Sequence, residues 1–268
     1  MIKRLKALMN RDVRRDYCRY CWSRLIHGGK SGLRLHGIYF EDFPSFTEYH
    51  GLNTFFSNDE FEFLSTMHLE NGAVMDIGAS YGLWSLLLAK RFPDRQVYAF
   101  EPNPYVVPYL KANIDKNSAK SINIYPCAVS AKSGEISFEA KRKGSYTSHM
   151  ILSGATEEAT RVTAFSIDDF VSLKGVGQIA FVKIDVEGFE TEVLIGAEKC
   201  LCEKKIRIIF MEVCPALTIF AGYDPEKPLA MLEDAGYSWR RIEGDKLLPV
   251  TSKDIKNVDL ENWVACLD

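Results

Sequence analysis

Short apolar runs alternate with helix-length amphipathic segments along most of the chain after Gly72. The runs predict strands at residues 73–77, 96–100, 122–127, 180–184 and 207–212. The segments between them predict helices at about residues 83–92, 104–116 and 189–202. This alternation is typical of a parallel sheet built from βαβ units. The pattern therefore predicts an α/β, Rossmann-like fold, in which a mostly parallel, twisted sheet is flanked by helices.

Two regions depart from this alternation. Residues 134–142 and 161–165 have the pattern of added antiparallel β structure rather than of a helix. Near the end of the chain, a predicted helix at residues 228–235 precedes strands near 238–242 and 263–267. The first region interrupts the βαβ pattern between its third and fourth strands, and the second region follows its fifth strand.

The first 70 residues follow a different pattern. Apolar side chains at steps of three or four in residues 2–25 predict an amphipathic helix, which ends at a pair of glycines. A strand at about residues 33–40 and a short helix at 59–68 follow. We therefore divide the chain into an N-terminal cap, residues 1–70, and a main domain, residues 71–268.

Charge is distributed unevenly between these parts. Residues 1–34 hold ten Lys and Arg against two Asp, a net charge of +8, whereas the remainder holds 23 basic and 34 acidic residues, a net charge of −11. The acidic remainder argues against a nucleic-acid substrate, because phosphate backbones require a cationic surface. The basic helix in residues 1–25 predicts peripheral contact with an anionic membrane or an acidic partner; a solvated face on a packed helix explains the same pattern.

Other sequence features bear on the cellular compartment. No apolar run approaches the roughly 20 residues that span a membrane, and arginines interrupt the N-terminus before the core of a signal peptide forms. We therefore expect a cytoplasmic protein, peripheral at a membrane if the basic helix binds one. The seven cysteines are odd in number and indicate reduced thiols. Cys18 and Cys21 do not have the spacing of a zinc site with the nearby histidines, so we expect no metal there.

A glycine turn follows the first predicted strand of the main domain. Gly78 allows the backbone to turn tightly and approach a ligand, and Gly82 allows the next helix to begin close to the strand. Asp76 precedes the turn, where it suits a cationic sulfonium amino acid. Glu101 follows the neighbouring strand, where its carboxylate can accept hydrogen bonds from both ribose hydroxyls of a nucleoside. Together these residues predict a nucleoside site.

Two other interpretations of the glycine turn are weaker. A nicotinamide site expects G-x-G-x-x-G, whereas the glycines here are spaced G-x-x-x-G. The turn also spells G-x-S-x-G around Ser80, the nucleophile elbow of α/β-hydrolases. However, the one histidine after Ser80 is His149, which lies in a polar stretch before the fourth strand, where a hydrolase base is not expected. We keep an NAD-type oxidoreductase as the less favoured alternative.

A second group of polar residues follows the fourth predicted strand. Asp185 and Glu187 stand at its carboxyl end, so they should face the same crevice as the glycine turn. Either carboxylate could accept a proton from an acceptor during group transfer. Two other roles remain open: Asp185 and Glu187 could bind a divalent ion together with Glu212, and Glu187 could stabilise the start of a helix.

These motifs occur in an order that resembles the FkbM-type methyltransferases, which use S-adenosylmethionine and often methylate hydroxyl groups of sugars and other natural products. The resemblance covers about residues 70–215 and rests on an ordered set of blocks: V-M-D-I-G-A-S-Y-G at 74–82, V-Y-A-F-E-P-N-P at 97–104, C-A-V-S at 127–130, S-I-D-D-F at 166–170, F-V-K-I-D-V-E-G-F-E at 181–190, V-L-I-G-A at 193–197 and M-E-V at 211–213. The ordered set is far more specific than any one block. Ser80 and Trp84 are mild departures from the residues expected at their positions.

The resemblance implies the class I methyltransferase version of the Rossmann-like fold and a role for each matching residue. The methionine end of S-adenosylmethionine would be shaped by Asp76, Gly78, Ala79 and Gly82. Glu101 would hold the ribose, Ala128 would lie near the adenine, and Asp185 would lie between cofactor and acceptor.

The implied reaction is O-methylation of a hydroxyl on a sugar-containing or secondary-metabolite acceptor, with Asp185 and Glu187 as catalytic residues. The alternative is a scaffold that binds S-adenosylmethionine without turnover. The cap matches no family pattern, and we expect acceptor choice to depend on it and on residues 144–160.

Overall fold

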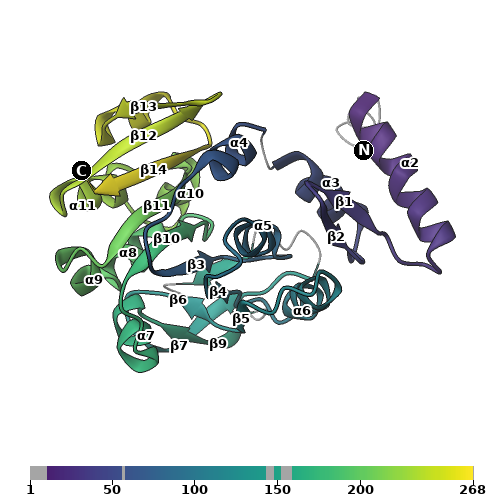
Figure 1. Ribbon diagram of the computed structural model, residues 1–268, viewed down its shortest axis with the longest axis horizontal. Coiled ribbons are helices and arrows are strands. Elements are labelled where there is room, and N and C mark those ends of the chain that lie inside the picture. The colour runs from purple at the N-terminus through teal and green to yellow at the C-terminus, as the bar shows by residue number, and fades with distance from the viewer. Residues whose placement is uncertain (1–10, 56–57, 143–147, 152–158, 268) are drawn as a thin grey trace.

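A central eight-stranded sheet organises the chain (Figure 1). The computed structural model describes residues 11–55, 58–142, 148–151 and 159–267. In spatial order the strands are β13 (Lys246–Val250), β12 (Tyr237–Glu243), β14 (Glu261–Leu267), β11 (Ile206–Val213), β10 (Ile179–Ile184), β3 (Ala73–Ile77), β4 (Val97–Phe100) and β5 (Ile122–Tyr125). The five strands predicted for the parallel sheet are all present.

The strand order confirms the predicted fold class. Strands β5, β4, β3, β10 and β11 are parallel, whereas β14, β12 and β13 continue the sheet with antiparallel pairing. The chain runs outward from β3 through β4 to β5 and then returns to β10 on the other side of β3. Ligands of such sheets bind at the carboxyl ends of the strands beside this reversal. The topology therefore places a binding crevice at the ends of β3 and β10.

Apolar clusters cover both faces of the sheet. On β10, Phe181 belongs to one buried cluster and Val182 to the other, because neighbouring side chains of a strand point to opposite faces. All six residues of β10 are buried, which explains its unbroken apolar run in the sequence. The flanking helices are α5 (Leu83–Arg91), α6 (Val107–Lys116), α7 (Ile167–Lys174), α8 (Glu190–Ile195), α9 (Glu198–Cys202), α10 (Pro215–Phe220), α11 (Glu226–Asp234) and the 3₁₀ helix η2 (Ser252–Asn257).

One helix predicted at residues 189–202 is two helices in the structure, α8 and α9. The break lies at Gly196, where an added Cβ would come within 2.2 Å of the Ser130 carbonyl oxygen. The close approach of another backbone segment thus explains the glycine and the interruption.

The added β structure is a separate four-stranded sheet with the order β6 (Ala128–Val129), β9 (Ala159–Phe165), β7 (Gly134–Glu139) and β8 (His149–Ile151). Strand β7 pairs antiparallel with both β8 and β9, as the sequence predicts. The parallel pairing of β6 with β9 attaches this sheet to the segment that follows β5.

The cap contains α2 (Arg11–Ile26), β1 (Leu33–Leu35), β2 (Ile38–Phe40), α3 (Phe46–Phe55) and α4 (Asn58–Thr66). The strand predicted at residues 33–40 is a two-stranded hairpin. Phe40 and Phe43 are fully buried in the same cluster as Tyr81 and Trp84 of the main domain. The two parts therefore share one apolar cluster, and we keep the boundary near residue 70 as a proposal about sequence organisation.

Helix α2 is held in part by polar contacts that its apolar pattern does not predict. Asp16 is buried and accepts hydrogen bonds from the side chains of His50 and Asn53, whereas Tyr17 of the predicted apolar stripe is 46% exposed. The first nine residues of the predicted helix, 2–10, lie outside the described residues. Among the helices that the structure describes, none is long and apolar enough to cross a membrane.

The Gly78 turn depends on the absence of a side chain. An added Cβ at Gly78 would lie 1.9 Å from the Asp185 carbonyl oxygen, and its φ is 81°. We expect Gly78→Ala to lower the free energy of unfolding by roughly 3 kcal/mol or more, measured by urea denaturation. Gly175→Ala is the matched control, because Gly175 also has a positive φ but has free space around its Cα; it should cost only about 1 kcal/mol. Equal losses would show that backbone conformation alone requires Gly78.

Candidate active site

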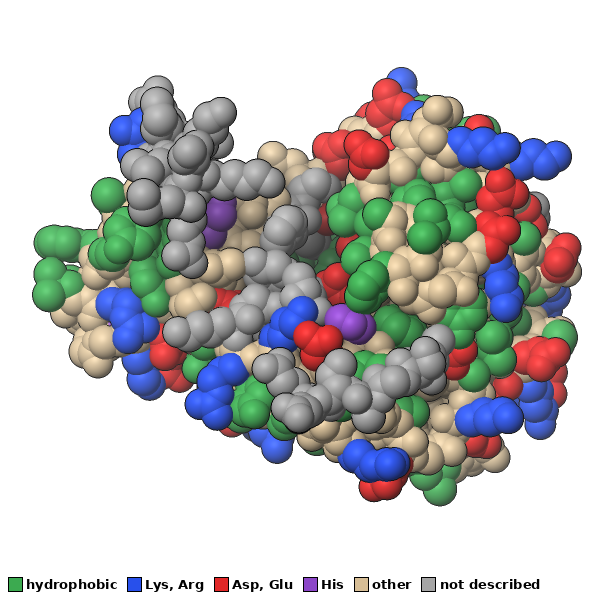
Figure 2. Space-filling model, turned by 180° about the vertical axis from the view of Figure 1, so that it is seen from behind, with side chains coloured by type: hydrophobic (Ala, Val, Ile, Leu, Met, Phe, Trp, Pro, Cys, Tyr) green, Lys and Arg blue, Asp and Glu red, His purple; other side chains and the backbone are tan. Residues whose placement is uncertain are grey.

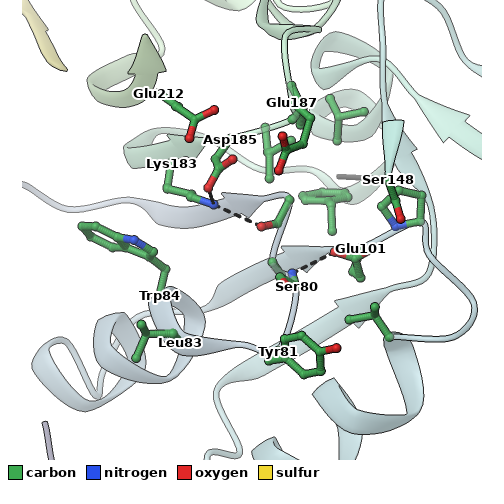
Figure 3. A pocket seen from close by; sticks show the side chains of 18 of the residues that line it. Ser80, Tyr81, Leu83, Trp84, Glu101, Ser148, Lys183, Asp185, Glu187 and Glu212 are labelled. Atoms are coloured by element: carbon green, nitrogen blue, oxygen red, sulfur yellow. Dashed lines mark hydrogen bonds and ion pairs between the residues drawn. The ribbon is translucent and has the colours of Figure 1, made fainter. Parts of the chain in front are cut away.

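A cavity of about 310 Å³ opens at the carboxyl ends of β3, β4, β10 and β11 (Figure 3). Its wall includes the glycine turn, the segment from Cys127 to Val129, the loop after β10 and residues of the cap. This is the position that the strand order predicts for a ligand.

The glycine turn forms one side of the cavity. Gly78, Ser80 and Gly82 all have positive φ angles, of 81°, 49° and 89°. The backbone N–H groups of Gly78 and Ala79 donate to the Phe100 carbonyl oxygen, which ties the turn to β4. Ser80 is not a glycine, so its left-handed backbone carries a cost of about 1 kcal/mol. Strained residues of this kind are common at binding sites.

Glu101 lies beside the turn and is held by the backbone. Its carboxylate accepts hydrogen bonds from the N–H of Ser80 and the N–H of Asn103, both at 2.8 Å. The side chain is buried, and burial raises its pKa to about 7, against the opposing effect of these two hydrogen bonds. Each carboxylate oxygen can accept a further hydrogen bond. Glu101 can therefore receive the two hydroxyls of a ribose.

An apolar wall adjoins Glu101. It is formed by Cys127, Ala128, Val129, Phe138 and Met150, all of which are buried. Phe138 and Met150 come from β7 and β8, so the second sheet closes this end of the cavity. A flat, apolar heterocycle such as adenine fits between such side chains.

A buried ion-pair network forms the floor of the cavity. The Lys183 ammonium lies 2.9 Å from Asp185 Oδ2 and 3.8 Å from Asp76 Oδ1, and it donates to the Gly78 carbonyl oxygen. The neighbouring carboxylates raise the pKa of Lys183 against the opposing effect of its burial. Asp76 is fully buried and also accepts a hydrogen bond from the Ser85 hydroxyl. Burial raises the pKa of Asp76, whereas Lys183 and Ser85 oppose that shift.

The loop after β10 adds further carboxyl groups. Glu187 lines the cavity with a φ of 56°, and burial together with Asp185 and Glu190 raises its pKa to about 8. Glu212, at the end of β11, also lines the cavity, and burial raises its pKa to about 10. Glu190 accepts the N–H groups of Val186 and Gly188 and so holds the loop from behind.

The cap and the antiparallel strands complete the cavity on the far side of Lys183. Trp84 lies there, together with Glu48 and Leu52 of α3, Glu60 of α4, Leu217 of α10, and Leu260 and Asn262 near β14. The Glu60 carboxylate accepts a hydrogen bond from the Asn262 amide, which links α4 to β14. No local sequence motif marks these residues, because chain segments far apart in the sequence bring them together.

Six of the eight predicted site residues line the cavity: Gly78, Ala79, Glu101, Ala128, Asp185 and Glu187. Asp76 and Gly82 do not line it. Asp76 lies beneath the floor, in contact with Lys183, and Gly82 packs against Leu110 at the start of α5. Within the predicted acceptor loop at residues 144–160, Ser148 and Met150 line the cavity, while residues 144–147 and 152–158 lie outside the described ranges.

The sequence left open whether the carboxyl groups of this site bind a divalent ion. Across the described stretches of the chain, no group of three or more His, Cys, Asp and Glu side chains has an arrangement that could hold a metal ion.

A family model described as the methyltransferase FkbM domain matches residues 76–239, which include the glycine turn, Glu101 and the loop after β10. The chain belongs to the FkbM methyltransferase family. Membership confirms the predicted family, the enzyme class and S-adenosylmethionine as the cofactor. The residues present fit this cofactor, because the glycine turn, Glu101 and the apolar wall suit its amino acid, ribose and adenine parts in that order along one cavity.

Three curated proteins illustrate the similarity of this FkbM-family chain to known enzymes. It is 30% identical over 169 residues to the hexuronic acid methyltransferase AglP of Haloferax volcanii, an alignment that covers 63% of this chain and 64% of AglP. It is 23% identical to the 2-O-methyltransferase NoeI of Sinorhizobium fredii, over 70% of this chain and 83% of NoeI. It is 29% identical to the 31-O-demethyl-FK506 methyltransferase FkbM of Streptomyces tacrolimicus, over 47% of this chain and 59% of that protein. The chain thus spans less than two thirds of the length of AglP.

The pKa of Glu101 predicts a pH-dependent affinity for the neutral product S-adenosylhomocysteine. Below about pH 7 the carboxyl is protonated and loses charge-assisted hydrogen bonds, so affinity should fall about fivefold between pH 8 and pH 5.5. Calorimetric titration measures this, with NAD as the ligand control. Glu101→Gln should bind more weakly at pH 8 and show a flat profile. An identical pH dependence in both proteins would assign the proton to another group.

Proposed function

We propose that this protein transfers the methyl group of S-adenosylmethionine to a hydroxyl oxygen of a small-molecule or glycan acceptor. The observation that carries the proposal is one continuous cavity, which joins the cofactor-binding turn and Glu101 to the carboxyl groups after β10. The names of NoeI and of the S. tacrolimicus enzyme specify O-methylation, and that of AglP specifies a sugar acid. These names support an oxygen acceptor on a sugar or a secondary metabolite.

The chain's own residues supply binding, orientation and proton transfer. When bound, S-adenosylmethionine supplies a methyl group activated by its positively charged sulfur. Gly78, Ala79, Glu101 and Ala128 form the predicted binding surface for it. Lys183 fixes the orientation of Asp185 through their ion pair. Trp84 and Leu217 line the opposite wall, where apolar surface limits the access of water.

Asp185 and Glu187 remain our candidates for the group that receives the acceptor proton. Asp185 stands at the junction of the cofactor and acceptor ends, and its side chain is 36% exposed. Glu187 is more enclosed, and its pKa of about 8 allows it to hold a proton at neutral pH. A scaffold that binds the cofactor without turnover is the competing proposal. Family membership and the glycine spacing both argue against the NAD-type oxidoreductase. The five-residue glycine turn lacks the glycine that approaches a pyrophosphate.

Substitution of Asp185 separates catalysis from binding. Asp185→Asn should lower the rate of transfer at least a hundredfold, while affinity for S-adenosylhomocysteine changes by less than about tenfold. Lys183 keeps Asp76 as a partner in this variant. The rate is followed as S-adenosylhomocysteine released from S-adenosylmethionine in the presence of a mixture of glycosides and hydroxylated metabolites. Normal transfer by Asp185→Asn would move the proton acceptor elsewhere, and binding without transfer to any acceptor in the wild type would favour the scaffold.

We also propose that α2 places the protein at an anionic membrane surface. Trp22, Leu25 and Ile26 are 64%, 73% and 56% exposed near the end of this helix. Hydrophobic side chains project at the end of the molecule that α2 forms (Figure 2). Arg15 and Arg19 lie exposed on the same helix. Exposed apolar side chains among arginines fit the boundary between anionic headgroups and acyl chains.

Vesicle sedimentation tests the membrane proposal on the full chain. Vesicles rich in phosphatidylglycerol should retain the protein, whereas neutral phosphatidylcholine vesicles should retain severalfold less. The double variant Trp22→Ala with Leu25→Ala should lose most of the retention. Leu173→Ala is the matched control, because Leu173 is 66% exposed on α7. Equal retention of the double variant and the control would refute the assignment.

A further inference from the structure

Carboxyl side chains outnumber basic side chains in the wall at the acceptor end of the cavity. Asp185 and Glu187 approach from the loop after β10, and Glu212 approaches from the end of β11 (Figure 3). Glu48 and Glu60 line the same cavity from the cap. Among the described residues of the cavity wall, Lys183 is the one basic side chain.

The charge of Lys183 is already matched by other groups. Its ammonium pairs with Asp185 and Asp76 and donates to the Gly78 carbonyl oxygen. In the described part of the chain, no ion pair joins Glu187 or Glu212 to a basic side chain. Glu212 Oε2 is enclosed and has no hydrogen-bond partner. Within the described ranges, these two carboxyl groups therefore have no ion-pair partner of their own.

The groups that face this pair are mostly acidic. Asp185 and Glu190 raise the pKa of both carboxyl groups, whereas Lys183 lowers it. Glu187 also raises the pKa of Glu212. Lys141, from the segment after β7, acts on Glu187, but it also pairs with Glu139 at 3.2 Å. Burial raises the pKa of the Cys214 thiol, near Glu212, so this group stays neutral and contributes no charge.

Glu187 and Glu212 are half-buried beside other carboxyl groups, surroundings in which a carboxyl group holds a proton or meets a cation. Burial and the neighbouring carboxylates keep the pKa of Glu187 at about 8 and that of Glu212 at about 10, so protons occupy these groups at neutral pH. S-Adenosylmethionine is cationic at sulfur, whereas S-adenosylhomocysteine is neutral there. The two ligands therefore present different charges to the same cavity.

We propose that Glu187 and Glu212 form a functional pair that releases a proton when the cationic cofactor binds and takes one from the acceptor hydroxyl during transfer. This inference rests on the proposed function. The carbon–sulfur bond breaks, a carbon–oxygen bond forms, the hydroxyl loses its hydrogen as a proton, and a carboxylate oxygen gains that proton. Nothing is oxidised or reduced. The pair is ionised while the sulfur is cationic and protonated again once the sulfur is neutral, so the base becomes available only when the methyl donor is present.

Glu212 acts in this scheme as the second member of a coupled pair, because an ionised Glu187 raises the pKa of Glu212. The proton released on cofactor binding comes from the pair as a whole, so removing the Glu212 carboxyl should remove its share of that proton. The substitution Glu212→Gln preserves the shape of the side chain, and it removes an acidic group that lacks a partner for one of its oxygens.

Calorimetry in two buffers of different ionisation enthalpy tests the inference without an acceptor. At pH 7.5, binding of S-adenosylmethionine should release roughly one proton more than binding of S-adenosylhomocysteine. Because wild type and variants bind the same two ligands, the ligands' own amino and carboxyl groups contribute equally in each protein and cancel when the proteins are compared. Glu212→Gln should lose at least half of the difference. Glu135→Gln, which changes an exposed glutamate of β7, should retain it.

Equal proton release for the two ligands in the wild type would overturn the inference, as would an unchanged difference in Glu212→Gln. Affinity for S-adenosylhomocysteine reports whether that variant is folded, and Glu187→Gln provides a second variant with the same expected loss. If the proton difference is present but no acceptor is methylated, the proposed function fails and the coupling stands. If S-adenosylmethionine does not bind, both proposals fail.

Discussion

The interactions of the buried Lys183 ammonium group hold both ends of the cavity in place. It holds the glycine turn through the Gly78 carbonyl oxygen, the end of β3 through Asp76, and the loop after β10 through Asp185. Removing one member of a buried charge cluster leaves the others uncompensated, at a cost of several kcal/mol. The lysine thereby keeps two backbone turns, more than a hundred residues apart, in a fixed relation. The cofactor end and the acceptor end of the cavity are consequently one rigid unit.

The cofactor half of the site could be predicted from the sequence because its signals are local. Strands buried on both faces form continuous apolar runs, and a parallel sheet brings their carboxyl ends to one edge. Gly78, Glu101 and Asp185 each follow such a run directly, so their convergence in one cavity follows from the strand order. The family resemblance then identified S-adenosylmethionine as the ligand of the crevice that the strand pattern had predicted.

Beyond Asp185 and Glu187, the individual residues of the acceptor half could not be predicted, although the cap was expected to contribute, because they depend on contacts between distant segments. Glu48 and Glu60 reach the cavity by packing of the cap against α5 and β14, and no periodicity in the sequence reports such packing. The position of Asp76 beside the glycine turn predicted contact with the ligand, whereas the structure places its side chain beneath the cavity floor, where it accepts a hydrogen bond from Ser85. Its part in binding the cofactor stays a prediction. In α2 the apolar spacing is consistent with the packing of Tyr20 against Phe46 and Tyr49, but it gives no sign of the buried polar contacts of Asp16.

The cap contributes residues to the cavity wall from outside the stretch of chain that matches the family. Glu48, Leu52 and Glu60 lie before residue 76, outside the stretch that matches the family, whereas the cofactor turn and Glu101 lie within it. Under the proposed function, mutations in the cap after a gene duplication would change part of the wall at the acceptor end while the donor site is inherited intact. The same division makes the cap the natural region to randomise when an enzyme of this design is directed toward a new acceptor.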